Sequence, residues 1–118
     1  MTQTDTTPIW TSLPAAVRTY LTAHEARDTA TALSAFTADA AVTDEGHTVR
    51  GRDAIEIWLG SAGSEYTFTT EFTGALSTGP DSVDVMQRLE GDFPGGVADL
   101  HYRFTLDGDA ISRLVIEP

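Results

Sequence analysis

The first half of the chain carries hydrophobic residues at the spacing of amphipathic helices. Apolar side chains recur three and four positions apart, and Ser12 and Asp28 each precede such a run, where they can cap a helix. Pro14 suits the first turn of the first helix. Gly46 and Gly51 bracket a hairpin or loop before the last helix. The pattern predicts helices over 13–26, 28–36 and 53–60, and a short strand over 40–44.

After Gly63 the hydrophobic period changes to two, the period of a half-buried β-strand. Hydrophobic and polar residues alternate over 66–73, 83–90 and 99–106, and a last strand is expected over 111–116. Turn residues fill the links between these segments. Three helices followed by a meander of antiparallel strands predict an α+β fold, in which one sheet face covers the helices. The other face is rich in threonine, so we expect it to pair with a second copy in a homodimer.

Length and composition exclude several classes of protein and site. The 118 residues suffice for one core, and we expect a single domain over 13–118 after a polar N-terminal arm over 1–12. The chain has no cysteine and no lysine, which excludes thiol and Schiff-base chemistry. A net charge of −11 disfavours nucleic acid and anionic membranes as partners, because like charges repel. The sequence shows neither a secretory signal pattern nor a membrane-spanning apolar run, so a cytoplasmic protein is expected.

The histidines and serines form no recognisable metal or nucleophile motif. His24, His47 and His101 lack the HxxxH or HxH spacing of a metal site, so we expect neither a metal nor a cofactor. No GxSxG motif is present, which leaves serine nucleophiles unsupported. His47 lies in a glycine-flanked loop and His101 on the outward phase of its strand. Both are therefore expected outside any pocket.

Three stretches resemble the NTF2-like superfamily, in its SnoaL-like and ketosteroid-isomerase-like branch. They are VRTYLTAHEARDTATALSAF, AVTDEGHTVRGRDAIEIWL and GDFPGGVADLHYRFTLDGDAI. The resemblance implies a cone in which a curved antiparallel sheet wraps around a long helix, with three N-terminal helices packed on the sheet and a pocket at the open end. This fold hosts isomerases, cyclases, dehydratases and non-catalytic binding proteins, so the resemblance is specific for the fold and weak for the reaction.

The same resemblance implies roles for individual residues. In the steroid isomerases of this superfamily a carboxylate at the end of the first strand moves a proton, while a tyrosine on the first helix and a protonated carboxyl on a later strand hold the oxyanion. On that pattern Tyr20 takes the tyrosine position, and Glu45 or Asp44 takes the position of the base. The third position falls at or beside Tyr102, which departs from the pattern because the nearest acid, Asp99, lies in the opposite strand phase.

The residues themselves leave alternatives open. Asp44 and Glu45 are adjacent on a strand, so at most one points into the pocket; both could equally be loop acids that pair with nearby arginines. Tyr20 and His24 lie four apart on the buried face of the first helix. A buried tyrosine hydroxyl needs a partner, and His24 could be that partner or could share a ligand with it. The alternative is a hydrogen-bonded core pair.

Several apolar or amide side chains could serve the core, the pocket or both. Trp58 and Phe72 are of this kind, and Gln87 interrupts an otherwise apolar strand phase, so its amide is expected to face the cavity. The sequence thus predicts a pocket for a small hydrophobic molecule. Whether the protein is an enzyme stays open. It could be a cofactor-free isomerase, cyclase or dehydratase that acts on a hydrophobic carbonyl compound through a carboxylate base; the alternative is a non-catalytic binding or dimerisation module.

Overall fold

The computed structural model of the chain describes residues 10–61 and 66–118. Most of the polar arm predicted over 1–12 lies outside the described residues, as does Gly63; Trp10–Ser12 form a short 3-10 turn, η1. The helices are α1 (Ala15–Glu25), α2 (Thr29–Ser34) and α3 (Arg52–Ser61), and the strands are β1 (Phe36–Asp44), β2 (His47–Arg50), β3 (Phe68–Gly79), β4 (Ser82–Gly91), β5 (Val97–Asp107) and β6 (Ala110–Glu117). The predicted α+β class is confirmed.

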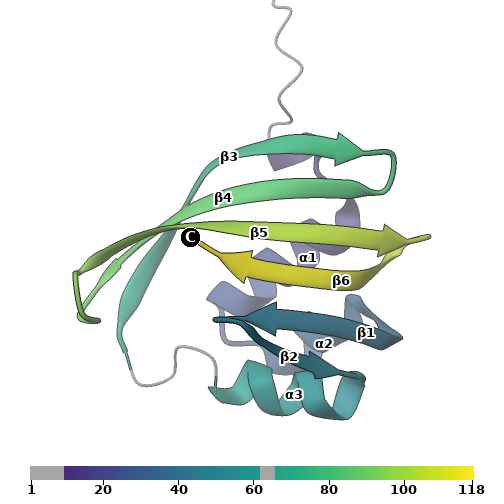
Figure 1. The fold of residues 1–118 in the computed structure, drawn as a ribbon, viewed down its shortest axis with the longest axis horizontal. Helices are drawn as coiled ribbons and strands as arrows, with labels where there is room; N and C mark the ends of the chain where they lie inside the picture. The colour runs from purple at the N-terminus through teal and green to yellow at the C-terminus, as the bar shows by residue number, and fades with distance from the viewer. Residues whose placement is uncertain (1–9, 62–65) are drawn as a thin grey trace, which may run out of the picture.

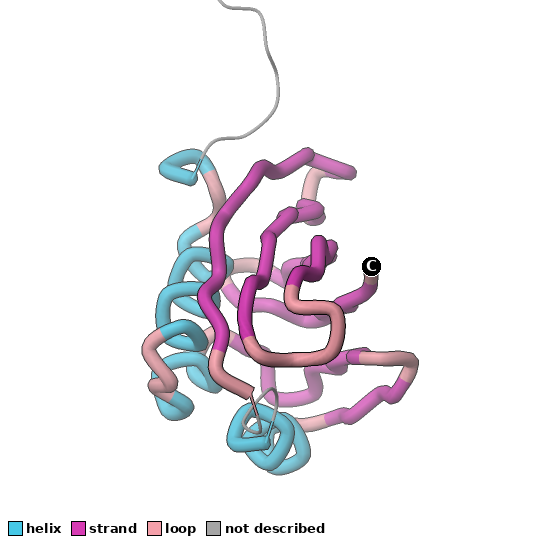
Figure 2. The backbone as a smooth tube through the Cα atoms, turned by 90° about the vertical axis from the view of Figure 1, so that its left-hand side faces the viewer, coloured by secondary structure: helices cyan, strands magenta, loops and turns pink. Residues whose placement is uncertain are grey.

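The strands of the described part form one six-stranded sheet in the order β2-β1-β6-β5-β4-β3 (Figure 1). Neighbouring strands run antiparallel, with the exception of β1 and β6, which run parallel. The sheet is therefore mostly, and not wholly, antiparallel. Figure 2 shows that it is curved and that the helices lie on one side of it. The three-helix, curved-sheet arrangement expected from the sequence is confirmed.

Local sequence determines where the first two helices begin and end. Asp28 caps α2 as predicted, because its carboxylate accepts a hydrogen bond of 3.2 Å from the backbone N–H of Thr31. The cap predicted at Ser12 is wrong: Pro14 occupies the N-cap of α1 with extended backbone angles. The predicted end of α2 at Phe36 is also wrong. Phe36 instead begins β1 and pairs with Ile111 of β6, so β1 is longer than the predicted strand.

The hydrophobic core fills the space between the helices and the inner face of the sheet. Helix α1 buries Val17 and Leu21, one turn apart, and α3 buries Ile55 and Leu59 at the same spacing. The inward phase of β4, β5 and β6 supplies the opposite wall with Val83, Val85, Tyr102, Phe104, Leu114 and Ile116. The period-two pattern thus identified the buried face of these strands. No helix in the described ranges is long and apolar enough to cross a membrane.

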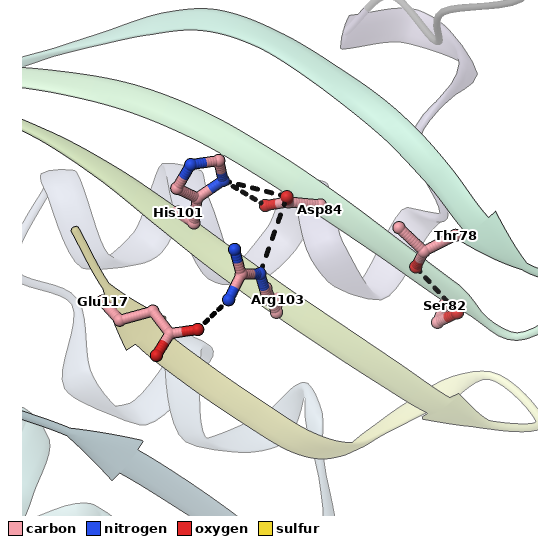
Figure 3. A network of polar contacts seen from close by, with 6 residues as sticks. All are labelled: Thr78, Ser82, Asp84, His101, Arg103 and Glu117. Carbon is pink, nitrogen blue, oxygen red and sulfur yellow. Dashed lines mark hydrogen bonds and ion pairs between the residues drawn. The ribbon is translucent and has the colours of Figure 1, made fainter. Parts of the chain in front are cut away.

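The outer face of the sheet carries a network of charged side chains (Figure 3). Asp84 of β4 accepts a hydrogen bond of 2.9 Å from Nδ1 of His101 on β5, and Nε of Arg103 lies 3.6 Å from the same carboxylate. Arg103 also pairs with Glu117 of β6. His101 is on the outward phase, as predicted. Asp84 points the same way but is only 8% exposed, because its partners cover it.

Candidate functional site

A partly open cavity of about 150 Å³ lies between α1, α3 and the inner face of the sheet. Of the eight residues that the sequence singled out for a site, the cavity is lined by Tyr20, His24, Asp44, Glu45, Trp58, Gln87 and Tyr102. Phe72 is not among the lining residues. Its ring packs edge-on against Trp10 at a centroid distance of 5.5 Å, because η1 folds over this part of β3. The structure therefore gathers side chains from distant segments around one space.

Asp44, the last residue of β1, lies half-buried in the cavity wall. Its carboxylate oxygen Oδ2 accepts a hydrogen bond of 3.0 Å from the indole N–H of Trp58. Trp58 reaches it because Ile55 and Leu59 anchor α3 against the core, which turns the indole toward the end of β1. A carboxylate held this way by a single donor keeps other lone pairs free to accept a proton. The arrangement fits a positioned base.

Glu45 occupies a different environment from its neighbour. It forms the turn between β1 and β2 with Gly46, and its φ of 52° is left-handed. This turn reverses the strand so that Asp44 pairs with His47. Glu45 is exposed, so its side chain lines the cavity at the solvent end. The structure thus gives the two adjacent acids different depths: Asp44 is half-buried against an indole, and Glu45 is at the rim.

Tyr20 is fully buried, and its hydroxyl has no hydrogen-bond partner among the described residues. Edge-to-face contacts with Phe36 at 5.5 Å and Phe104 at 5.7 Å fix the ring. The sequence allowed His24 as the partner of this hydroxyl, but no hydrogen bond joins the two among the described residues. The His24 ring instead stacks on the Tyr20 ring at a centroid distance of 5.6 Å. Burial raises the pKa of Tyr20 well above its ordinary value, and Tyr102 and Asp44 add to this. The hydroxyl therefore keeps its proton and remains available as a donor.

Tyr102 provides a second protonated hydroxyl in the cavity. Burial raises the pKa of Tyr102 to about 12; a hydrogen bond with the Gln87 side chain opposes the shift, and Asp44 adds to it. Gln87 is itself only 8% exposed, so this hydrogen bond satisfies a buried amide. Unlike Tyr20, Tyr102 therefore has a protein partner. The two phenols therefore differ in whether a protein side chain already bonds to the phenol oxygen.

His24 separates Tyr20 from Trp58 as the middle ring of a stack. Its ring lies 5.6 Å from Tyr20 and 6.3 Å from Trp58, at interplanar angles of 25° and 19°. Burial lowers the pKa of His24, Arg27 lowers it further, and Asp44 partly opposes these effects. The folded protein therefore favours the neutral imidazole near neutral pH. In the folded protein His24 therefore contributes an aromatic ring to the stack, and mostly no charge.

This environment predicts a pH-dependent stability. The unfolded chain binds a proton at His24 near pH 6.5, while the folded chain resists it, so stability falls as the pH drops below about 6.5. The slope from this one group is at most about 1.4 kcal/mol per pH unit. We expect His24→Phe, which keeps an aromatic plate without a titrating nitrogen, to lose less stability than wild type between pH 7.5 and pH 5 in urea unfolding. The exposed His47→Gln serves as the control. An unchanged slope in His24→Phe would contradict the burial of His24.

The remaining walls of the cavity come from residues that the sequence did not indicate. Phe68 and Phe93 lie near one another, edge-on at a centroid distance of 6.3 Å. Phe93 belongs to the GDFPGG link, which by composition reads as a turn alone. The other apolar lining residues of this group are Leu21, Leu89, Leu100 and Ile116. The inward phase of the strands could have identified the last three; no local signal places Phe93 at a pocket. Within the described ranges, no cluster of His, Cys, Asp or Glu has the makings of a metal site.

The fold matches that of solved proteins. A candidate polyketide cyclase from Sinorhizobium meliloti is 32% identical, with a TM-score of 0.86, over 93% of this chain and 100% of that chain. This chain belongs to the NTF2-like superfamily, in its SnoaL-like and ketosteroid-isomerase-like branch. The membership confirms the resemblance inferred from the three sequence stretches.

More distant members of the NTF2-like superfamily share the fold at low identity. The Δ5-3-ketosteroid isomerase of a Mycobacterium species is 18% identical, with a TM-score of 0.71, over 88% of this chain and 90% of that chain. A Mycobacterium tuberculosis protein solved in complex with estradiol-17β-hemisuccinate is 14% identical, with a TM-score of 0.72, over 87% and 90%. No family model and no curated protein matches the sequence. These likenesses show the shared fold.

Proposed function

We propose that this NTF2-like protein transfers a proton at the carbon next to a carbonyl group, without a cofactor, on a small hydrophobic compound. One observation carries the proposal: the carboxylate of Asp44 and the buried hydroxyl of Tyr20, which has no partner among the residues that the structure describes, line the same apolar cavity. Proton abstraction next to a carbonyl needs a base at the carbon and a donor at the oxygen, where negative charge develops. Asp44 and Tyr20 have these two chemistries.

The reaction follows from the two groups. Asp44 takes the proton from the α-carbon, the C–H electron pair forms a carbon–carbon double bond, and the carbonyl π pair moves to the oxygen. Tyr20 donates its hydrogen bond to that oxygen, and Tyr102 is placed to assist. Where the compound has a double bond between its β- and γ-carbons, return of the proton to the γ-carbon isomerises it. Alternatively, the α-carbon attacks a second carbonyl and closes a ring, and the new alkoxide takes the proton from Asp44. A β-hydroxyl that takes this proton leaves as water, which dehydrates the compound. The relatives named as an isomerase and as a candidate cyclase support this class.

The size of the cavity bounds the ligand. An apolar protein cavity of about 150 Å³ accommodates benzene, and the cavity here is of about that volume. The enclosed part therefore suits one ring with its carbonyl, and a larger ligand would extend through the open end. Aromatic side chains, Trp58 and Phe68 among them, provide the apolar contact. Binding of a small hydrophobic molecule agrees with the steroid bound by the Mycobacterium tuberculosis relative.

The proposal is tested by deuterium exchange into acetophenone, a one-ring ketone whose methyl protons are the α-protons. In D2O, proton NMR should record loss of the methyl signal faster with the protein than with buffer alone. Titration calorimetry on the same sample measures binding separately. Binding without accelerated exchange would favour the alternative function, a non-catalytic ligand-binding module, and would reject proton transfer.

We also propose that the protein is a cytoplasmic homodimer, each chain a single domain over 13–118, that pairs through the outer face of the sheet. The described residues leave this face uncovered by helices (Figure 2). A standard interface buries about 1,200–2,000 Å² in total. Light scattering at micromolar concentration should therefore give twice the mass of one chain. Val115→Glu, on the outward phase of β6, should shift the protein to monomer, whereas Ile57→Glu, 75% exposed on α3, should not. A monomeric wild type would contradict the dimer.

A further inference from the structure

The solvent end of the cavity is lined by carboxylates and aromatic rings. Glu25, the last residue of α1, and Glu45, in the turn after β1, are both exposed and both line the cavity. The rings of Phe68 and Phe93 line it as well. With Asp44 further in, three acids and no arginine line the described cavity. The exposed end of the cavity therefore carries negative charge, and aromatic rings belong to the same lining.

Charge at an exposed rim is not in itself a binding site, but this rim leads to a buried group that needs a partner. The hydroxyl of Tyr20 has no hydrogen-bond partner in the described protein, and the Tyr20 side chain is fully buried while lining the same cavity. A ligand oxygen would satisfy it. This orients a ligand: its carbonyl lies inside at Tyr20, and its opposite end lies at the rim between Glu25 and Glu45.

One positive charge, that of Arg27, contacts a ring that lines this cavity. The guanidinium carbon of Arg27 lies 5.7 Å from the centroid of Phe68, which is a cation–π distance. Arg27 lines a neighbouring cavity with Asp28, and His24 lines both cavities. Arg27 therefore does not line the main cavity, whereas three carboxylates do. Three lining carboxylates and a net charge of −11 for the chain favour a negative field at the rim.

We propose that the ligand carries a positive charge at the end opposite its carbonyl, so that the protein selects hydrophobic ketones bearing a protonated amine. The inference rests on the proposed function for the orientation of the ligand. An ammonium group at the rim gains attraction to Glu25 and Glu45 and to the π face of Phe93. A carboxylate in the same place meets repulsion from two like charges. The rim thus sets specificity, while Tyr20 and Asp44 set the chemistry.

Three acetophenones that differ only in the para substituent test the proposal. The substituents are 2-(dimethylamino)ethyl, which is protonated at pH 7, its uncharged isostere 3-methylbutyl, and 2-carboxyethyl. Each exposed carboxylate should favour the amine over the carboxylate probe by about two- to fivefold, the range of exposed ion pairs. Titration calorimetry should therefore give a ratio of about four to twenty-five. The ratio should fall as salt is raised from about 0.01 M to about 0.5 M, because both acids are in solvent.

Paired variants attribute the effect to the rim. In the double variant Glu25→Gln, Glu45→Gln the amine probe should bind several-fold more weakly, while the uncharged isostere binds as it does to wild type. Glu56→Gln, exposed on α3 and outside the cavity lining, removes the same charge elsewhere and should keep the preference. An equal ratio of amine-probe to carboxylate-probe affinity in the double variant and in wild type would overturn the proposal. Tightest binding of the carboxylate probe would also overturn it and would indicate that Arg27 determines the preferred charge at the rim.

The outcomes also separate this inference from the proposed function. Deuterium exchange into the uncharged isostere reports proton transfer and does not depend on the sign of the rim. Exchange into that isostere, with no preference for the amine, would reject only the charge selection. A preference for the amine without exchange into any probe would keep the cationic ligand and reject the reaction. Failure of all three probes to bind would reject the cavity as a ligand site, and the inference with it.

Discussion

Asp44→Asn is expected to slow deuterium exchange into a bound ketone by about 10²–10⁴-fold, the usual contribution of a positioned general base. The asparagine has nearly the same shape, and its carbonyl oxygen can still accept the hydrogen bond from Trp58. What the variant loses is the capacity to take up a proton at that place. Binding of the ketone, measured by calorimetry, should change little.

Two further variants make this result specific to Asp44. Glu56→Gln removes one negative charge from the exposed surface of α3 and should exchange as wild type does. Glu45→Gln tests the other acid of the pair, which the sequence allowed as the base. If Glu45→Gln loses exchange and Asp44→Asn keeps it, the base is the rim acid. If both variants keep it, the proton transfer belongs elsewhere, and His24 is the next residue to replace.

Tyr20→Phe is expected to lower activity and raise stability at the same time. Removal of one donor to a developing oxyanion typically slows a reaction by about 10²–10³-fold. A buried hydroxyl without a partner costs about 1–3 kcal/mol of stability, so its removal should raise the free energy of unfolding by up to about that much. Exchange kinetics and urea unfolding measure the two effects separately. We expect activity and stability to change in opposite directions, because a hydroxyl that binds a ligand has no hydrogen-bond partner when the ligand is absent.

Tyr102→Phe is the matched control for that experiment. Tyr102 is buried too, but its hydroxyl is hydrogen-bonded to Gln87, so the variant leaves a buried amide unpaired. Its stability should therefore fall. If Tyr20→Phe destabilises the protein as much as Tyr102→Phe does, the Tyr20 hydroxyl has a partner in the folded state. In that event it is not held ready for an oxyanion.

The sequence predicted those parts of the fold in which burial follows a local period. Helices α1 and α3 and the inner faces of β4 and β5 were found because one stripe or alternate residues are apolar. The start of β1 was missed because the burial of its residues does not follow a period of two, and its strand status depends on pairing with β6, some 70 residues later. Such distant pairing leaves no signal in a local window.

The sequence indicated residues that line the candidate cavity but not the contacts between them. Resemblance to the NTF2-like fold indicated Tyr20 and either Glu45 or Asp44, and seven of the eight residues singled out line one cavity. The hydrogen bond from Trp58 to Asp44 depends on how α3 is rotated against the core, which no residue pattern expresses. Phe93 was missed because it lies in a glycine-rich turn, and Phe72 was misplaced because η1 covers it.

The place of β6 in the sheet has a consequence for the order in which the chain assembles. Strands β1 and β2 come early, β3, β4 and β5 come later, and β6, the last strand in chain order, lies between β1 and β5. During synthesis neither half of the sheet has its neighbour until β6 leaves the ribosome. Asp44 of β1 and Tyr102 of β5 therefore lie in two parts of the sheet that are not joined until then. Pairing of strands as distant in the chain as β1 and β6 is slow. Until it is complete, the nascent chain exposes two unpaired sheet edges, which are the kind of surface that chaperones bind.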